Sequence, residues 1–184
     1  LKVTYRDESM KGFHSMAVSR IGEMMVARGN FDEAIRAYSA GVAGDPNDAE
    51  MHYGYGMALR GKGKQEEALQ RFETALKLNP KHAGALIGKA AIYYDMGDVP
   101  GALSLMEDAI NLAPNSPIPY GVLSRFYEDM KKPYESRLML GHYYFNTGNI
   151  VMAANEYRGA LAIKETADAY QTLGVALLRL GETK

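Results

Sequence analysis

Few residue patterns in this 184-residue chain suggest chemistry. The run from Gly56 to Gly63 reads GMALRGKG, which is one residue short of a phosphate-binding loop. Such a loop needs a serine or threonine directly after its lysine, to bind the metal of a nucleotide, and a strand before the loop. Here a glycine follows Lys62. We therefore interpret the run as a coincidence of glycines and predict no nucleotide cofactor.

Metal-binding and catalytic patterns are also missing from the sequence. The four histidines form no His-Glu-x-x-His pair or similar ligand spacing; they are His14, His52, His82 and His142. There is no cysteine, which excludes disulfides and cysteine–zinc sites. No spacing suggests a serine, histidine and acid triad, although triads are assembled in space and not in sequence. We predict no metal, no cofactor and no catalytic residue, and therefore no enzyme in this chain.

Composition narrows the classes of partner. The net charge is −1, whereas a nucleic-acid partner normally requires a basic stripe, so we predict no nucleic acid. No apolar run reaches the length of a membrane helix, so we expect a soluble protein of the cytoplasm or the periplasm. The chain starts at Leu1 without a signal-peptide pattern, which indicates a mature product or a fragment of a larger protein.

The spacing that organises the chain is a repeat of 34 residues, in which six positions agree in three consecutive copies. These positions are Gly22, Gly29, Ala34, Tyr38, Gly41 and Pro46, then Gly56, Gly63, Ala68, Phe72, Ala75 and Pro80, and then Ala90, Gly97, Ala102, Met106, Ala109 and Pro114. A period of this length with small, aromatic and proline positions is typical of an array of helix–turn–helix hairpins.

Each of these positions has a physical role in such a hairpin. Small residues such as Gly56 and Ala68 let two antiparallel helices approach where they cross. Large residues such as Tyr38 and Phe72 are expected to fill the space between successive hairpins. Glycines such as Gly63 adopt the left-handed conformation that ends a first helix. The prolines end the second helix, because proline lacks the amide and disfavours helix before it.

The repeated residues resemble the tetratricopeptide repeat (TPR) family. The resemblance implies an all-α fold, a right-handed superhelical solenoid of about ten helices. We expect residues 1–12 to form a lead-in and residues 13–184 to form a single solenoid. Its parts are expected at about 15–48, 49–82 and 83–116 for three repeats, 117–133 for an extra helix, 134–166 for a further repeat, and 167–181 for a terminal helix.

The extra, unpaired helix near 116–131 is predicted because the pattern shifts after Pro114. The helix that follows Pro133 again carries the features of a first helix. Its Gly141 lies 51 residues beyond Ala90, which is one and a half repeat lengths. The array therefore gains half a unit at this point.

The TPR resemblance also implies a binding groove, because the first helix of each hairpin lines the concave face of such arrays. The residues predicted to line it are Tyr53, Met57, Ile87, Tyr94, Arg125, Leu138, His142 and Phe145. Aromatic residues and methionine are enriched in the cores of protein interfaces, which favours a protein or peptide partner. The alternative is that some of these side chains only pack against neighbouring hairpins.

A narrower resemblance covers Pro119 to Leu161. The runs 120–127 and 135–149, with Ala153 and Ala160 after them, are similar to the C-terminal TPR region of bacterial zinc metallopeptidases of the BepA type. Those regions also carry unpaired helices among their repeats. The resemblance implies a periplasmic module whose catalytic domain is absent from this chain.

Three functions follow from these patterns. The first is a non-enzymatic protein–protein interaction scaffold that binds a peptide or partner protein in its concave groove. The second is a regulatory or substrate-presenting appendage of a periplasmic zinc metallopeptidase. The third is self-association through the C-terminal end after Leu180, where the face of an unpaired helix would be apolar.

Overall fold

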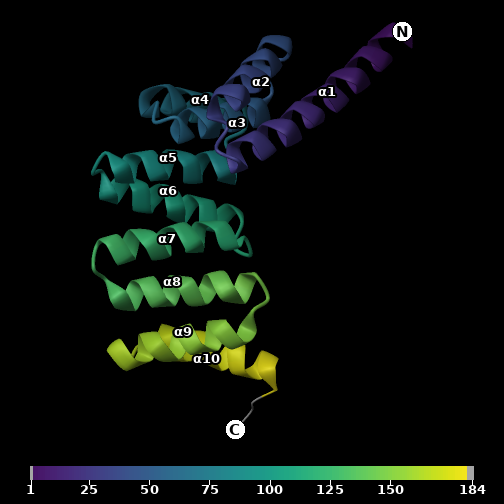
Figure 1. Cartoon of the computed structure of the whole chain (residues 1–184). Helices are drawn as coiled ribbons and strands as arrows, with labels where there is room; N and C mark the ends of the chain where they lie inside the picture. Colours follow the sequence, from purple (N-terminus) through teal and green to yellow (C-terminus); the bar gives the residue numbers. More distant parts are fainter. Residues whose placement is uncertain (1, 182–184) are drawn as a thin grey trace. The chain divides into compact units, whose positions relative to one another are not determined.

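Helices make up most of the part of the chain that the structure describes. A computed structural model describes residues 2–181, with the side chains from residue 15 onward, and every regular element in this part is an α-helix (Figure 1). The helices are α1 (Lys2–Ala27), α2 (Phe31–Gly44), α3 (Ala49–Gly61), α4 (Gln65–Leu78), α5 (Ala83–Asp95), α6 (Val99–Leu112), α7 (Pro117–Asp129), α8 (Pro133–Asn146), α9 (Ile150–Ile163) and α10 (Ala167–Leu180). The predicted all-α fold class is confirmed.

The helices group into two units by their contacts. Unit 1 comprises residues 1–98 with α1 to α5, and unit 2 comprises residues 99–184 with α6 to α10. Within each unit every helix packs against the next one in the chain, and in unit 1 α3 also packs against both α1 and α5. Because α1 begins at Lys2, the stretch expected to be a lead-in is helical and continuous with the first repeat helix.

Large side chains seated against glycines hold the hairpins of unit 1 together. Phe72 of α4 is fully buried and lies between Gly56 of α3 and Gly88 of α5. A Cβ atom would lie 2.6 Å from the Phe72 ring at Gly56 and 2.5 Å from it at Gly88. Tyr38 of α2 lies in the same way between glycines of α1 and α3. The predicted role of Tyr38 and Phe72, which is to fill the space between hairpins, is confirmed.

Five of the short turns between successive helices each hold one residue in the left-handed conformation. Glycine fills this position at residues 29, 63, 97 and 148, with φ angles of 76°, 84°, 87° and 84°. The turn between α7 and α8 has Lys131 there instead, at φ 55°. Lys131 stands 34 residues after Gly97, so it occupies the glycine position of the repeat. A residue with a Cβ atom is disfavoured in this conformation.

Replacing Lys131 with glycine is therefore expected to stabilise unit 2. The gain in the free energy of unfolding should be of the order of 1 kcal/mol, because glycine adopts the left-handed region without steric cost. Urea denaturation of the full chain measures it. Lys132→Gly is the matched control, because Lys132 has a φ of −110° and gains nothing from glycine. Equal effects of the two substitutions would contradict the explanation.

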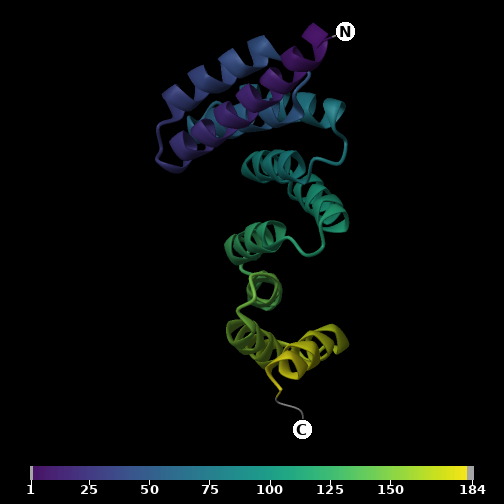
Figure 2. The same cartoon turned by 90° about the vertical axis from the view of Figure 1, so that its right-hand side faces the viewer.

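Helix α8 takes part in two hairpins. Ser124 of α7 and Ser136 of α8 meet where these helices cross, with their hydroxyl oxygens 3.2 Å apart. Gly141, further along α8, receives the ring of Tyr157 from α9. Figure 2 views α8 nearly along its axis, with α7 on one side and α9 on the other. The helix expected to be unpaired, α7, is therefore packed along α8 and not isolated.

Candidate binding site in unit 2

The residues predicted to line the groove fall into two sets, one in each unit. Unit 1 holds Tyr53, Met57, Ile87 and Tyr94, and unit 2 holds Arg125, Leu138, His142 and Phe145. All four residues of the first set are half-buried. In the second set Arg125 is exposed, His142 and Phe145 are half-buried, and Leu138 is only 6% exposed. Leu138 belongs to the core between α8, α9 and α10, which places it away from any accessible groove.

Two of the unit 1 residues, Tyr53 and Met57, pack against the core of their own unit. The Tyr53 ring lies 6.2 Å from the ring of Phe72 and 4.8 Å from that of His82, measured between ring centroids. Tyr53 and Met57 both lie against the cluster that contains Phe72. The alternative stated from the sequence, that some predicted groove residues pack against neighbouring hairpins, therefore describes these two side chains.

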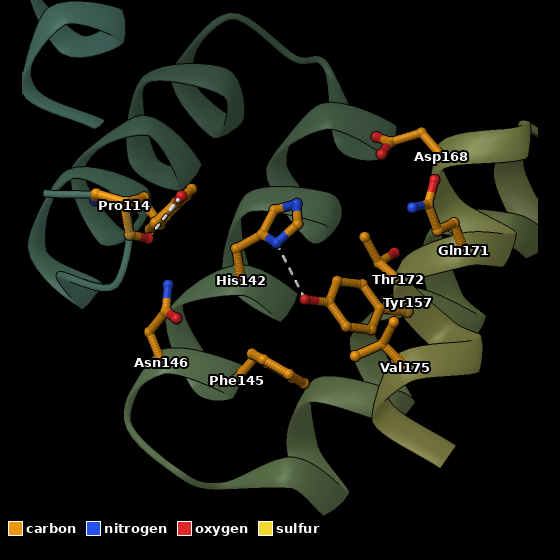
Figure 3. Close-up of a pocket in the computed structure, with 10 residues that line it drawn as sticks. Pro114, His142, Phe145, Asn146, Tyr157, Asp168, Gln171, Thr172 and Val175 are labelled. Atoms are coloured by element: carbon orange, nitrogen blue, oxygen red, sulfur yellow. Dashed lines mark hydrogen bonds between the residues drawn. The ribbon is translucent and has the colours of Figure 1, made fainter. Parts of the chain in front are cut away.

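Unit 2 has a hollow of about 290 Å³ into which both His142 and Phe145 project. Its walls come from the segment before α7, the first turn of α7, the last turns of α8, the middle of α9 and residues 168–175 of α10 (Figure 3). The lining residues are Pro114, Tyr120, His142, Phe145, Asn146, Tyr157, Asp168, Gln171, Thr172 and Val175. We refer to this space as the unit 2 hollow.

The sequence explains locally why these helices present these residues. The Asn149 side chain accepts the amide of Met152 at the start of α9, and the Thr166 hydroxyl accepts the amide of Ala169 at the start of α10. Side-chain oxygens at these positions stabilise the first turn of a helix. The Thr166 hydroxyl also lies 2.6 Å from the hydroxyl of Tyr134 on α8. The start of α10 is thereby tied to the start of α8.

A tyrosine–histidine pair forms the floor of the hollow. The Tyr157 hydroxyl lies 3.1 Å from Nδ1 of His142, and Figure 3 shows the other ring nitrogen of His142 directed away from Tyr157. Burial raises the pKa of the Tyr157 hydroxyl, so it keeps its proton. Burial also lowers the pKa of His142, although the Asp168 carboxylate opposes this shift. With His142 neutral and its proton on Nε2, the hydroxyl donates to Nδ1 and the Nε2–H group is left for a ligand.

The pKa of His142 is expected below the ordinary histidine value of 6.5. The unfolded chain then takes up this proton at a higher pH than the folded chain, so the stability contributed by neutral His142 is complete above pH 6.5 and is lost as the pH falls toward the folded value. NMR titration of the imidazole in the full chain measures the pKa. Asp168→Asn should lower it further, because the carboxylate favours the protonated ring. A value at or above 6.5 would contradict the burial argument.

The charges around the hollow are unevenly placed. Asp168 stands in the first turn of α10, and among the described residues no cation forms an ion pair with it. One face of α10 continues from Asp168 through Thr172 and Val175 to Arg179. The Arg179 guanidinium lies 4.4 Å above the centroid of the Phe145 ring. The hollow is therefore negative at the start of α10, and α10 carries a positive charge near its end.

No catalytic constellation accompanies the hollow in the described residues. They contain no group of three or more His, Cys, Asp or Glu side chains that could hold a metal ion. None of the helices in the described part combines the length and the apolar character needed to cross a bilayer. The arrangement provides aromatic rings, two amides, three hydroxyls and a carboxylate, which are groups that bind a ligand by contact and hydrogen bonding.

Comparison with known proteins identifies the repeats. Two family models, both described as tetratricopeptide repeat, match the chain over residues 26–72 and residues 59–126. The chain carries tetratricopeptide repeats. The crystal structure of TTC0263, a thermophilic TPR protein of Thermus thermophilus, has a TM-score of 0.60 at 20% identity and aligns over 89% of this chain and 99% of that one. At this identity the likeness concerns the fold.

Curated relatives match this chain over small parts of their own length. Mouse protein O-mannosyl-transferase TMTC1 is 38% identical over 61 residues, which is 33% of this chain and 6% of the mouse protein. A probable UDP-N-acetylglucosamine–peptide N-acetylglucosaminyltransferase, SPINDLY, of Hordeum vulgare is 27% identical over 157 residues, which is 85% of this chain and 16% of the barley protein. The chain thus spans less than a fifth of the length of these relatives.

Sequence reasoning found two residues of the hollow, His142 and Phe145, and missed the contribution of α10. The signal was present. The predicted groove residues Tyr53 and Met57 lie four and eight residues beyond the start of α3 at Ala49. Applied to Ala167, the same offsets give Gln171 and Val175, both of which line the hollow.

Proposed function

We propose that this chain is a non-enzymatic binding module that holds a segment of a partner protein in the unit 2 hollow. Arrays of tetratricopeptide repeats form scaffolds whose helices create extended binding surfaces. The observation that carries the proposal is the hollow itself, where Gln171 and Val175 are exposed beside the rings of His142 and Phe145. A site of this kind combines apolar contact area with a few polar groups that orient the ligand.

Site-directed photo-crosslinking tests the proposal. A benzoylphenylalanine placed at Gln171 should crosslink a protein from a lysate of the source organism. The same group at Asn155 is the control, because Asn155 is exposed on α9 and does not line the hollow. Val175→Arg, which fills the hollow from an exposed position, should abolish the Gln171 crosslink. Crosslinks that are identical at both positions, or that survive Val175→Arg, would contradict the proposal.

Self-association is a second candidate, favoured by the outer face of α10. Tyr170 is 53% exposed and Leu178 is 64% exposed, and they lie eight residues apart on one face of the helix, with Gly174 between them. Light scattering of the full chain, compared with Leu178→Glu, tests this surface. A monomer at all concentrations would remove the candidate.

The role as an appendage of a metallopeptidase rests only on the resemblance of residues 119–161. Neither of the relatives named above is a metallopeptidase. We therefore base the proposed function on the hollow and not on that resemblance.

A further inference from the structure

The unit 2 hollow has the charge of a site for a cation. Of the described residues that line it, only Asp168 carries a full charge at neutral pH. Its negative charge acts on the centre of the hollow, because it raises the pKa of both His142 and Tyr157. At His142 this opposes the lowering of the pKa by burial, and at Tyr157 it adds to the raising of the pKa by burial. His142 stays neutral and does not compensate this charge. A ligand that brings a positive charge would supply the missing partner.

The aromatic rings that line the same hollow as Asp168 suit a flat organic cation. The ring of Tyr120 lies 5.3 Å from that of His142, and the ring of His142 lies 5.5 Å from that of Tyr157, measured between centroids. Cations are attracted to aromatic faces within about 6 Å. The contact between Arg179 and Phe145 shows that a guanidinium already stacks in this way at the other end of α10. The positive charge of Arg179 disfavours a second cation beside Phe145. A cationic ligand is therefore expected to bind near Asp168.

The partial charges at the end of α8 and at the start of α10 also affect a charged ligand in the hollow. His142, Phe145 and Asn146 belong to the last turns of α8, where the helix dipole contributes partial negative charge. The start of α10 contributes partial positive charge, about half an elementary charge. This is less than the full charge of Asp168, and the Thr166 hydroxyl already accepts one of the free amides of that end. The sum of the Asp168 charge and the partial charges of the two helix ends still favours a cation in the hollow.

From these observations we infer that the unit 2 hollow binds an arginine side chain of an extended partner segment, with the guanidinium at Asp168 and against the Tyr120 and His142 rings. Lysine would bind more weakly, because arginine can pair with a carboxylate through two hydrogen bonds and stack on a ring at the same time. A divalent metal fits poorly, since hard cations take six or more oxygen ligands and the hollow offers one carboxylate. The inference rests on the proposed function, because it names the chemistry of the bound segment.

A peptide selection followed by a matched affinity measurement tests the inference. A phage-displayed library of random heptapeptides is selected on the full chain, and the binders are synthesised with their arginine or with citrulline, which has the same shape without the charge. Wild-type chain should enrich arginine. Citrulline, and separately Asp168→Asn, should each weaken binding about tenfold, as expected when one charge-assisted contact is lost. Glu165→Gln is the control, because it removes an exposed carboxylate that does not line the hollow.

The outcomes separate this inference from the function on which it rests. Peptides that lose affinity with Val175→Arg but show no basic preference, and no response to Asp168→Asn, would overturn the arginine site and leave the binding function standing. A selection in which no binder depends on Val175 would overturn both. Circular dichroism melting of each variant confirms that the fold is retained, and the Asp168→Asn and Glu165→Gln chains should melt within about 5 °C of wild type.

Discussion

Replacing Gly88 with alanine is expected to lower the free energy of unfolding of unit 1 by about 1–3 kcal/mol. The added methyl group would lie 2.5 Å from Cζ of Phe72. The ring cannot move away, because it is fully buried and Gly56 lies against its other side. The backbones of α3 and α5 must therefore separate. Native-state hydrogen exchange of the unit 1 amides measures the loss without requiring the whole array to unfold in one step.

Two further variants distinguish overpacking from a general effect of alanine. Gly44→Ala, also in unit 1, places its methyl group where no atom lies within 4 Å and should change stability by less than about 0.5 kcal/mol. Phe72→Leu provides space for the methyl group at residue 88. The double variant with Gly88→Ala should therefore lose less stability than the sum of the two single losses. Strict additivity would mean that the ring and the glycine do not compete for space.

Removal of the Tyr157 side chain is expected to have the largest effect in unit 2. Tyr157 is 1% exposed and its ring lies against Gly141 of α8, so Tyr157→Ala leaves a cavity between α8 and α9. The expected loss is about 3–5 kcal/mol, as for other large aromatic residues truncated to alanine. Hydrogen exchange of the unit 2 amides measures it. Protection equal to that of wild type would show that α8 and α9 are held together by other contacts.

The conservative variant Tyr157→Phe separates the hydrogen bond from the packing. It keeps the ring and removes only the hydroxyl that pairs with His142 at 3.1 Å. Because His142 is half-buried and borders the hollow, water can replace part of the interaction. We expect a loss of about 1 kcal/mol. A loss as large as that of Tyr157→Ala would assign the effect to the hydrogen bond and not to the cavity.

The repeat spacing predicted most of the fold because its positions are fixed by packing. A small residue where helices cross, as at Gly56, and a ring between hairpins, as at Phe72, can each be met by few residue types. The packing of α7 along α8 was harder to predict. The crossing there is made by Ser124 and Ser136, and serine is not restricted to such positions. The left-handed turn at Lys131 could not be predicted from the sequence either, because the left-handed position is a glycine in the other turns of this kind.

The candidate site was only partly predicted, for a different reason. Inward positions on a helix can be read from spacing, which led to His142 and Phe145. Whether such a side chain borders open space depends on how closely the neighbouring helix packs. Leu138 occupies an equivalent position on α8 but is enclosed by α9 and α10, and the half-buried Tyr53 packs against the unit 1 core. The hollow exists because α10 presents short or polar side chains such as Thr172 opposite the last turns of α8.

The double engagement of α8 also limits how the C-terminal half of the chain can come apart. Helix α8 crosses α7 at Ser136, and its Gly141 packs against the Tyr157 ring of α9. Neither α7 nor α9 can therefore detach without exposing part of α8. Thermal opening should therefore release residues 117–163 as one cooperative block, and a protease that samples transient openings should find no early cleavage point in the loop 147–149. A terminal deletion that ends inside this block would leave a fragment unable to retain its shape, and one that ends at residue 166 would expose the core that α10 shares with α8 and α9.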